Sequence, residues 1–323
     1  MLRLPEFKLI MPNTLDEALN CLTKPGTAVV AGGTDLYPNL KRRQVKISTL
    51  ISLSRLNELR GIAGGGENGM TIGAAVSLTE VAGHPAINKY YPALAHAARL
   101  VSTPQLRNAG TIGGNVCLNT RCMYFNQNEL WRRGLGYCLK AFGTICQAAP
   151  NSRRCFAVSS ADTVPVLVAL AACLRLRGAT GEREIPIEEL YGADGINYLT
   201  KRSDEILTAI MLPPAAGLQM NYIKLRSRNS FDFPVVGVAA ALEKDDAARV
   251  VRARVVLGAV ESRPLLVKEA EVMTGHKLTE EIIDTVAGAA FKQARPLDNT
   301  DMGPAYRKRM ARELTVQALK QLA

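Results

Sequence analysis

Histidine and long hydrophobic runs are scarce in this chain, and each shortage argues against a class of function. The three histidines, His84, His96 and His276, are scattered and match neither a metal triad nor a Ser-His-Asp site. The longest apolar stretch, near residues 164–173, is shorter than the roughly 20 residues of a membrane helix. The N-terminus has no hydrophobic signal region, so we expect a cytoplasmic protein that binds no membrane.

Acidic residues are the minority charge. The chain has 29 Asp and Glu against 40 Lys and Arg, a formal net charge of +11. A basic surface suits nucleic acid or an acidic partner. The short basic runs at 41–43 and 307–309 belong to no nucleic-acid-binding motif, so we expect no nucleic acid among the partners.

Cysteine is unevenly distributed. Five of the seven cysteines lie between residues 117 and 155, directly after a glycine-rich turn. An odd number in a reducing compartment argues against a full set of disulfides and favours metal ligands or redox groups. The spacing fits neither a ferredoxin run nor the paired C-x-x-C of zinc ribbons. An iron–sulfur cluster, zinc and idle thiols therefore all remain open.

The same segment is rich in cations and aromatic rings. Residues 117–156 contain six basic residues and one acidic residue, Glu129, together with six of the 17 aromatic residues. Cations near an anionic cluster raise its reduction potential, and aromatic rings shield a cluster from solvent. A basic docking surface explains the charge equally well.

Periodicity and turn residues predict alternating helices and strands first, and strands followed by helices later. Thr14 and Glu17 form a capping-box pattern at the start of a helix. Further helices are predicted at 35–41, 92–101, 263–274, 279–294 and 304–322. Strands are predicted at 27–31, 50–53, 70–74, 220–226, 235–243 and 249–260. In the last strand, Val251, Ala253, Val255 and Leu257 form one face, with Arg252 and Arg254 on the other.

Two glycine-rich turns suggest a dinucleotide site. Loop 1 (residues 29–36) leaves an apolar strand through Gly32-Gly33, and loop 2 (residues 111–115) contains Gly113-Gly114. Glycine lets backbone amides approach phosphate closely. Two such turns can hold the two phosphates of a dinucleotide, although neither matches G-x-G-x-x-G or a P-loop.

In this order the turns resemble the two FAD loops of the flavin subunits of molybdenum hydroxylases. Residues 29–36 resemble the first loop and residues 103–115 the second. The resemblance continues in four further segments and covers nearly the whole chain. These segments are residues 12–19, 160–167, 222–228 and 305–309.

The resemblance implies an α+β fold. A two-part FAD-binding domain of the vanillyl-alcohol-oxidase (PCMH) type would span 1–57 and 58–216, and an α+β domain with a three-stranded antiparallel sheet and helices would span 217–323. It also implies FAD as cofactor, with Lys224 stabilising the anionic reduced flavin. The implied cofactor-binding residues are Val29, Val30, Ala31, Gly32, Gly33, Thr34, Asp35, Leu36, Val101, Thr111, Ile112, Gly113, Gly114, Asn115, Asp162, Leu207 and Lys224.

Residues 117–156 interrupt this resemblance, because most flavin subunits of the family pass quickly from the second loop to the Asp162 region. Residues 121–127 resemble the cluster segment of the 4-hydroxybenzoyl-CoA reductases, a branch with an additional [4Fe–4S] cluster. The match implies Cys122, Cys138, Cys146 and Cys155 as ligands. Cys117 would instead pack near the flavin.

The resemblance implies an electron-transfer subunit without a substrate site of its own. Electrons would pass from reduced ferredoxin through the [4Fe–4S] cluster and FAD to partner subunits with two [2Fe–2S] clusters and a molybdenum pterin. There 4-hydroxybenzoyl-CoA would be reduced to benzoyl-CoA. The implied assembly is a dimer of heterotrimers.

Two alternatives remain. The first is a conventional hydroxylase flavin subunit that passes electrons outward, with zinc or nothing at the cysteines. The second is a metal-stabilised module that binds an acidic partner.

Overall fold

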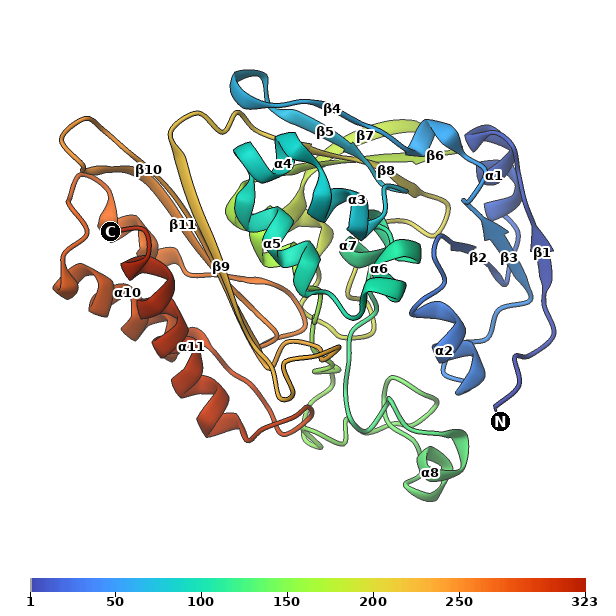
Figure 1. The fold of residues 1–323 in the computed structure, drawn as a ribbon. Coiled ribbons are helices and arrows are strands. Elements are labelled where there is room, and N and C mark those ends of the chain that lie inside the picture. The colour runs from blue at the N-terminus through green and yellow to red at the C-terminus, as the bar shows by residue number, and fades with distance from the viewer. Residues whose placement is uncertain (1) are drawn as a thin grey trace.

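The strands of the protein form three separate sheets (Figure 1). A computed structural model describes residues 2–323. The first sheet has the order β1-β3-β2 and consists of β1 (Lys8–Ile10), β2 (Thr27–Val30) and β3 (Thr49–Ser52), paired in parallel. Helices α1 (Leu15–Leu22) and α2 (Leu36–Lys41) connect these strands. The predicted start of α1 is confirmed, because the Thr14 side chain accepts a hydrogen bond from the Glu17 amide at 3.2 Å.

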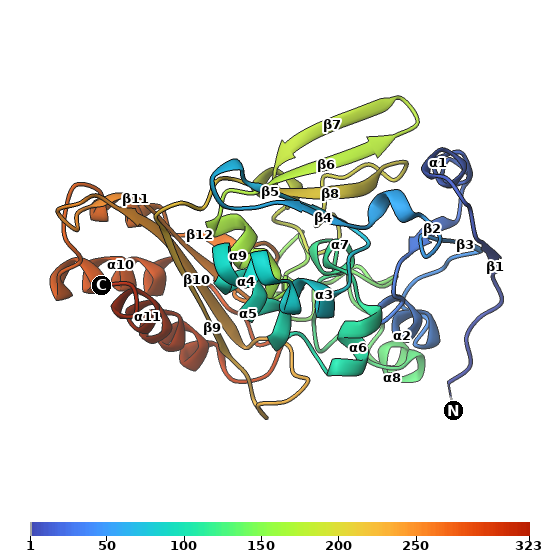
Figure 2. The ribbon, with the colours of Figure 1, turned by 45° about the horizontal axis from the view of Figure 1, so that its top comes forward.

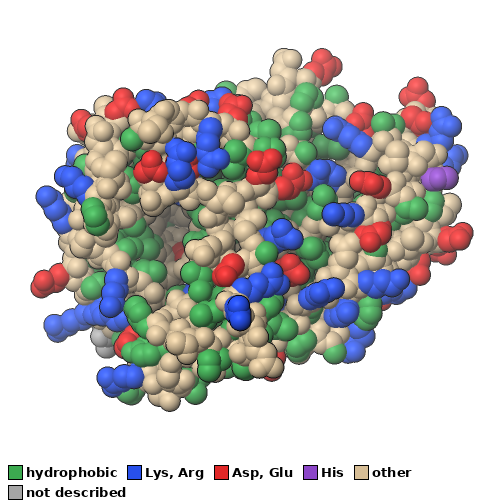
Figure 3. Space-filling view, turned by 180° about the vertical axis from the view of Figure 1, so that it is seen from behind, with side chains coloured by type: hydrophobic (Ala, Val, Ile, Leu, Met, Phe, Trp, Pro, Cys, Tyr) green, Lys and Arg blue, Asp and Glu red, His purple; other side chains and the backbone are tan. Residues whose placement is uncertain are grey.

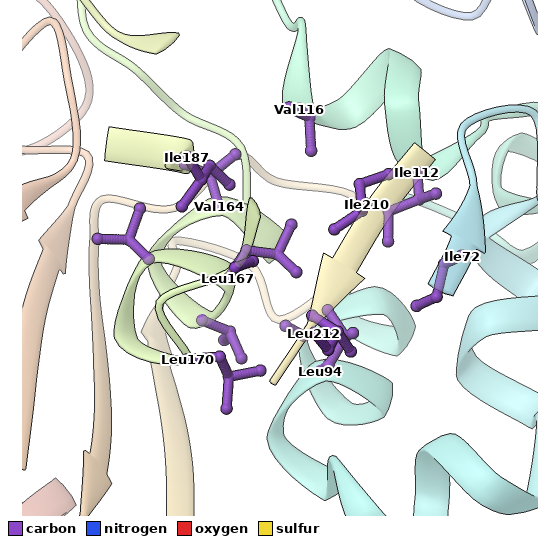
Figure 4. Packing of buried hydrophobic residues seen from close by; sticks show 14 of the residues in the cluster. Ile72, Leu94, Ile112, Val116, Val164, Leu167, Leu170, Ile187, Ile210 and Leu212 are labelled. Atoms are coloured by element: carbon purple, nitrogen blue, oxygen red, sulfur yellow. The ribbon is translucent and has the colours of Figure 1, made fainter. Parts of the chain in front are cut away.

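The second sheet is antiparallel, with the order β4-β5-β8-β6-β7. Its strands are β4 (Ile62–Gly64), β5 (Met70–Gly73), β6 (Cys173–Gly178), β7 (Gly181–Pro186) and β8 (Ile206–Leu212). The helices around it are α3 (Leu78–Gly83), α4 (Pro85–Tyr90), α5 (Pro92–Leu100), α6 (Pro104–Ala109), α7 (Ile112–Val116) and α9 (Thr163–Ala169). Side chains from α5, α7, α9 and β8 meet in the core between them (Figure 4). Short 3-10 turns lie at Asn57–Leu59, Gly66–Asn68 and Ile187–Leu190.

The third sheet has the order β12-β11-β10-β9 and is packed on both faces. It consists of β9 (Leu218–Leu225), β10 (Val236–Lys244), β11 (Val250–Gly258) and β12 (Leu265–Leu266). Helices α10 (Glu280–Gln293) and α11 (Pro304–Lys320) cover one face, and α9 lies against the other (Figure 2). Ala239 and Val256 accordingly belong to the core of the second sheet, whereas Ala240 and Val255 belong to the core beneath α10 and α11.

One sequence prediction fails in this region. The helix predicted at 263–274 is wrong: β12 pairs there with Val256 and Leu257, and a 3-10 turn, Lys268–Met273, follows. The sheet therefore has four strands instead of the predicted three. The predicted faces of β11 hold in the middle of the strand, where Ala253, Val255 and Leu257 pack beneath α10 and α11, but Val251 at its start is 51% exposed. The opposite face is covered as well, because Val256 is fully buried in the core of the second sheet.

Residues 117–156 form a cysteine lobe that projects beside α2, with α8 (Glu129–Gly134) at its tip (Figure 1). Arg132 is fully buried and donates to the carbonyl oxygens of Arg42 (2.7 Å) and Arg43 (3.1 Å), which seats the lobe on the end of α2. The chain enters and leaves the lobe side by side, because Arg121 and Val158 exchange backbone hydrogen bonds of 2.8 and 2.6 Å.

Candidate functional site

Loop 1 lies against Ala109 and Gly110, the two residues directly before loop 2. A Cβ atom on Gly32 would overlap the carbonyl oxygen of Ala109, and one on Gly110 would lie 3.5 Å from the Thr34 hydroxyl. Glycine at position 32 therefore allows the two segments to touch. The contact brings together segments about 80 residues apart in the sequence, as the two-loop hypothesis requires.

Loop 1 presents several amides without partners inside the protein. Val29 and Val30 end β2, Leu36 begins α2, and Gly33 between them has φ +69°. Within residues 2–323, the amides of Gly33, Thr34 and Asp35 have no hydrogen-bond acceptor. Successive amides of this kind form an anion nest. The loop thus fits a phosphate group.

Loop 2 is packed on one side and open on the other. Thr111 accepts a hydrogen bond from the Gly114 amide at 3.1 Å, and a Cβ atom on Gly113 would lie 2.7 Å from the Cβ of Ala74. Gly114 is exposed, and a Cβ there would approach only Thr111. Ile112 points into the core (Figure 4). Seen from behind, the surface is hollowed toward the side of the N-terminal sheet (Figure 3).

A buried ion pair joins β9 of the third sheet to the start of α9. Lys224 on β9 donates to Asp162 Oδ2 and to the carbonyl oxygen of Leu100, each at 2.9 Å. The Tyr222 hydroxyl donates to Asp162 Oδ1 at 2.9 Å. The side chains of Lys224 and Asp162 are only 1% and 4% exposed. The Lys224 ammonium is therefore fixed in place and largely shielded from water.

Burial sets the titration of this pair. It raises the pKa of Asp162 to about 6, against the opposing effect of Lys224 and of the hydrogen bonds from Lys224 and Tyr222. Burial also lowers the pKa of Lys224, although the Asp162 carboxylate opposes that change. Both groups are thus shifted toward their neutral forms.

Loop 2 is connected to the ion pair through Asn115. Its side-chain oxygen accepts hydrogen bonds from the Thr163 hydroxyl at 2.7 Å and from the Thr163 amide at 3.3 Å, directly after Asp162. Val101 follows Leu100, the acceptor of Lys224, and its own carbonyl accepts from Arg107 at 2.8 Å. Leu207 is buried in the core that includes α7. Hydrogen bonds thus place loop 2, the start of α9 and Lys224 next to one another.

The sequence predictions missed two residues at this site. Tyr222 lies two positions before Lys224 on β9, so strand alternation alone places both on the same face. A Cβ on Gly237 would lie 2.8 Å from the Tyr222 hydroxyl, so glycine leaves room for that ring. The other is Arg121, whose side chain pairs with Asp35 of loop 1. No local pattern identifies that contact, because the partners are 86 positions apart.

The four predicted metal ligands lie together inside the cysteine lobe. Cys122, Cys138 and Cys155 share one buried cluster with Phe125, and Cys146 is also buried, at 5% exposure. Burial raises the pKa of Cys138 and of Cys155, and Cys146 is close enough to both to raise them further. The lobe thus gathers four thiols from distant parts of its sequence.

Backbone amides point at three of these sulfurs. Burial raises the pKa of Cys122 to about 12, and the amides of Tyr124 and Phe125 act in the opposite direction. Cys138 likewise accepts hydrogen bonds from the amides two and three residues after it, those of Lys140 and Ala141. The Ala157 amide donates to Cys155 Sγ at 3.4 Å. Amide donors stabilise thiolate sulfur and tune iron–sulfur centres. The donor set fits a four-thiolate cluster.

Cys117 has different neighbours. Burial raises its pKa, and the nearby charge is that of Lys201.

Across residues 2–323, no three His, Cys, Asp or Glu side chains are grouped as ligands of a single metal ion. A four-iron cluster differs from a single ion in that each thiolate binds its own iron atom, which spaces the thiols more widely.

A half-buried lysine lies near the thiols. Lys140 Nζ donates to Asn119 Oδ1 at 2.8 Å, to the Thr120 hydroxyl at 2.5 Å and to the carbonyl oxygen of Gly195. Burial lowers its pKa to about 8, and the cysteines oppose this shift.

A separate groove of about 810 Å³ lies between the lobe and residues 5–48, but no predicted site residue lines it.

The geometry fits a dinucleotide-binding flavoprotein: loop 1 touches the segment before loop 2, and Lys224 is buried beside them. Residues 5–215 match the FAD-binding domain of molybdopterin dehydrogenases, and residues 221–322 match the C-terminal domain of the CO dehydrogenase flavoprotein. The chain therefore belongs to the FAD-binding medium subunits of the molybdenum hydroxylase family. It is an oxidoreductase subunit, and its predicted fold class is confirmed.

Curated and solved relatives span the same length. The glyceraldehyde dehydrogenase medium chain of Sulfolobus acidocaldarius is 26% identical over 99% of both chains. The nicotinate dehydrogenase FAD-subunit of Eubacterium barkeri is 28% identical over 86% of this chain and 83% of its own. A carbon monoxide dehydrogenase structure from Hydrogenophaga pseudoflava superimposes with a TM-score of 0.81 at 25% identity, covering 98% of this chain and 97% of that chain. Among residues 2–323, no helix has the length and hydrophobicity to cross a bilayer.

Proposed function

We propose that this chain binds FAD across loops 1 and 2 and carries electrons within a molybdenum hydroxylase complex. The observation that carries the proposal is the backbone contact at Gly32, beside three loop 1 amides that have no acceptor within residues 2–323. FAD supplies the ability to exchange one or two electrons, and the protein positions it.

The chain's own residues have separate tasks. The amides of loop 1 and the open backbone at Gly114 bind the diphosphate, and Val101 borders the same site. Asp162, Leu207 and Lys224 lie next to the flavin ring. Lys224 stabilises negative charge there because Asp162 and the Leu100 carbonyl hold its ammonium in a buried position.

The names of relatives support a multi-subunit assembly. "Medium chain" and "FAD-subunit" each denote one component of a larger enzyme. We therefore assign this chain partner subunits with a molybdenum pterin and with [2Fe–2S] clusters, in a cytoplasmic complex. These relatives are named as dehydrogenases, which favours electron flow from the molybdenum subunit outward through this chain. This is the conventional function of such a subunit.

The cysteine lobe supports a second candidate. Four buried thiols, three of them with amide donors, suit a [4Fe–4S] cluster held by Cys122, Cys138, Cys146 and Cys155. Such a cluster supplies a one-electron centre. In this candidate the chain serves a reductive enzyme, with reduced ferredoxin as donor and 4-hydroxybenzoyl-CoA as the substrate of the molybdenum subunit. The assembly would be a dimer of heterotrimers.

Iron, acid-labile sulfide and FAD should be measured on protein purified without oxygen. One FAD per chain supports the first proposal, and its absence contradicts it. About four irons and four sulfides per chain support the second candidate. FAD with zinc or without metal leaves the conventional function and removes the reductive one.

Two serine variants test the ligand set. Cys122→Ser should lose cluster iron, whereas Cys117→Ser should keep it, because Cys117 lies outside the group of four thiols. Full iron content in Cys122→Ser protein would overturn the assignment. Loss of iron in both variants would point to general damage of the lobe, which circular dichroism would detect.

A further inference from the structure

Arg121 connects three parts of the molecule. Its guanidinium pairs with Asp35 of loop 1 and lies 4.5 Å from the ring centre of Phe233, in the loop between β9 and β10. Its backbone pairs with Val158 at the base of the cysteine lobe, and the next residue is Cys122. The side chain is 11% exposed. Arg121 is therefore a buried cation that faces loop 1 from the lobe.

Asp35 creates an electrostatic problem for the proposed FAD site. Its carboxylate lies in the loop whose neighbouring amides, those of Gly33 and Thr34, suit an anion. A carboxylate beside a diphosphate raises the free energy of the bound state through like-charge repulsion. Asp35 also accepts a hydrogen bond from the Asn39 side chain at 2.9 Å, but a neutral amide leaves its charge uncompensated.

Arg121 is suited to compensate this charge. Burial strengthens a charge pair, because water screens it less than at the surface. The backbone of Arg121 is held by its pairing with Val158, and the guanidinium lies against the Phe233 ring. The lobe itself is fastened to the segment after α2, where Gln44 donates to the Phe125 carbonyl at 2.6 Å. Arg121 thus reaches loop 1 from a fixed support.

We propose that Arg121 is a positioning residue for FAD: by pairing with Asp35, it neutralises loop 1 and fixes its shape for the diphosphate. The inference rests on the proposed placement of FAD at loop 1. It gives the cysteine lobe a role in flavin binding that does not depend on which metal the lobe holds.

The test compares FAD affinity among four proteins by flavin fluorescence. Arg121→Gln should bind FAD roughly tenfold more weakly than the wild-type protein, since Asp35 keeps its charge. Asp35→Asn together with Arg121→Gln should recover most of that loss. Arg133→Gln removes an exposed cation of the same lobe and should bind FAD as the wild type does.

Salt dependence separates charge from shape. The defect of Arg121→Gln should shrink at high ionic strength, because Asp35 is 25% exposed and its repulsion is screened. Arg121→Lys should bind better than Arg121→Gln, since it keeps the charge. Unchanged affinity in Arg121→Gln, or no recovery in the double variant, would overturn the inference. Failure of the wild-type protein to bind FAD would instead refute the proposed function.

Discussion

Lys224 is the residue best placed to influence a flavin ring. Its ammonium is buried and held by two oxygens, so it contributes a fixed positive charge. Lys224→Met should lower the flavin midpoint potential by about 30 mV for the two-electron couple, which corresponds to about 1.4 kcal/mol of lost stabilisation. Spectroelectrochemical titration measures this shift. Lys89→Met, at an exposed position on α4, is the control, and equal potentials in both variants would refute the role of Lys224.

The raised pKa of Asp162 should make the free energy of unfolding depend on pH. Its native pKa of about 6 exceeds the ordinary value of 3.8, so between these values the folded protein binds the proton more tightly than the unfolded chain. Its contribution to stability therefore falls as the pH rises from about 4 to about 6, by about 3 kcal/mol in total. Urea unfolding of the wild type and of Asp162→Asn at several pH values should show this as a change in their difference. A constant difference would contradict the shifted pKa.

Single residues differ in how far the sequence alone could predict them. Lys224 and Asp162 were predicted, but only through the family resemblance, since 62 positions separate them and no local pattern joins them. Tyr222 could have been predicted from strand alternation with Lys224. The Arg121–Asp35 pair could not, because it depends on how the cysteine lobe folds back onto loop 1.

At the scale of elements, the contact between loop 1 and Ala109, just before loop 2, should be sensitive to one methyl group. Gly32→Ala would force the two segments apart, because its Cβ overlaps the Ala109 carbonyl oxygen and backbone cannot move aside easily. We expect a loss of bound FAD after gel filtration and a lower melting temperature. Gly288→Ala, inside α10 with nothing within 4 Å of its Cβ, should be neutral or stabilising by up to about 1 kcal/mol. Retention of FAD by Gly32→Ala would show that the contact is dispensable.

The elements most accurately predicted were those with strong local signals. The start of α1 at Thr14 and the strand 27–30 follow from a cap and a short apolar run. The segment 263–274 failed because its apolar residues fit a helical period, yet Leu265 and Leu266 pair with β11. Sheet pairing is a long-range interaction, so a helical period in the sequence did not reveal it.

At the scale of the whole molecule, the third sheet separates two hydrophobic cores and contributes side chains to both. Val256 and Val255 are adjacent, fully buried and point to opposite cores. Val256→Ala and Val255→Ala should each destabilise the protein by roughly 2 kcal/mol, since each leaves a small cavity. Only Val256→Ala should also weaken FAD retention, because its core includes α9, which follows Asp162.

Thermal unfolding and the FAD content of the purified protein check this pair. Equal loss of FAD in both variants would mean that the sheet acts on the flavin site only through global stability. The sequence of β11 did not reveal this two-sided burial, because Arg252 and Arg254 interrupt the apolar run that is typical of a strand covered on both faces.

The paired ends of the cysteine lobe affect how such a chain can gain or lose this segment during evolution. Because Arg121 and Val158 form one antiparallel bridge, everything between them starts and finishes at nearly the same point in space. We therefore expect that such a segment can be shortened, exchanged or transplanted without changing the backbone conformation of the residues on either side. Replacing residues 123–156 with a tight turn would be a protein-engineering route to a lobe-free scaffold, and grafting them onto a relative would be the reverse.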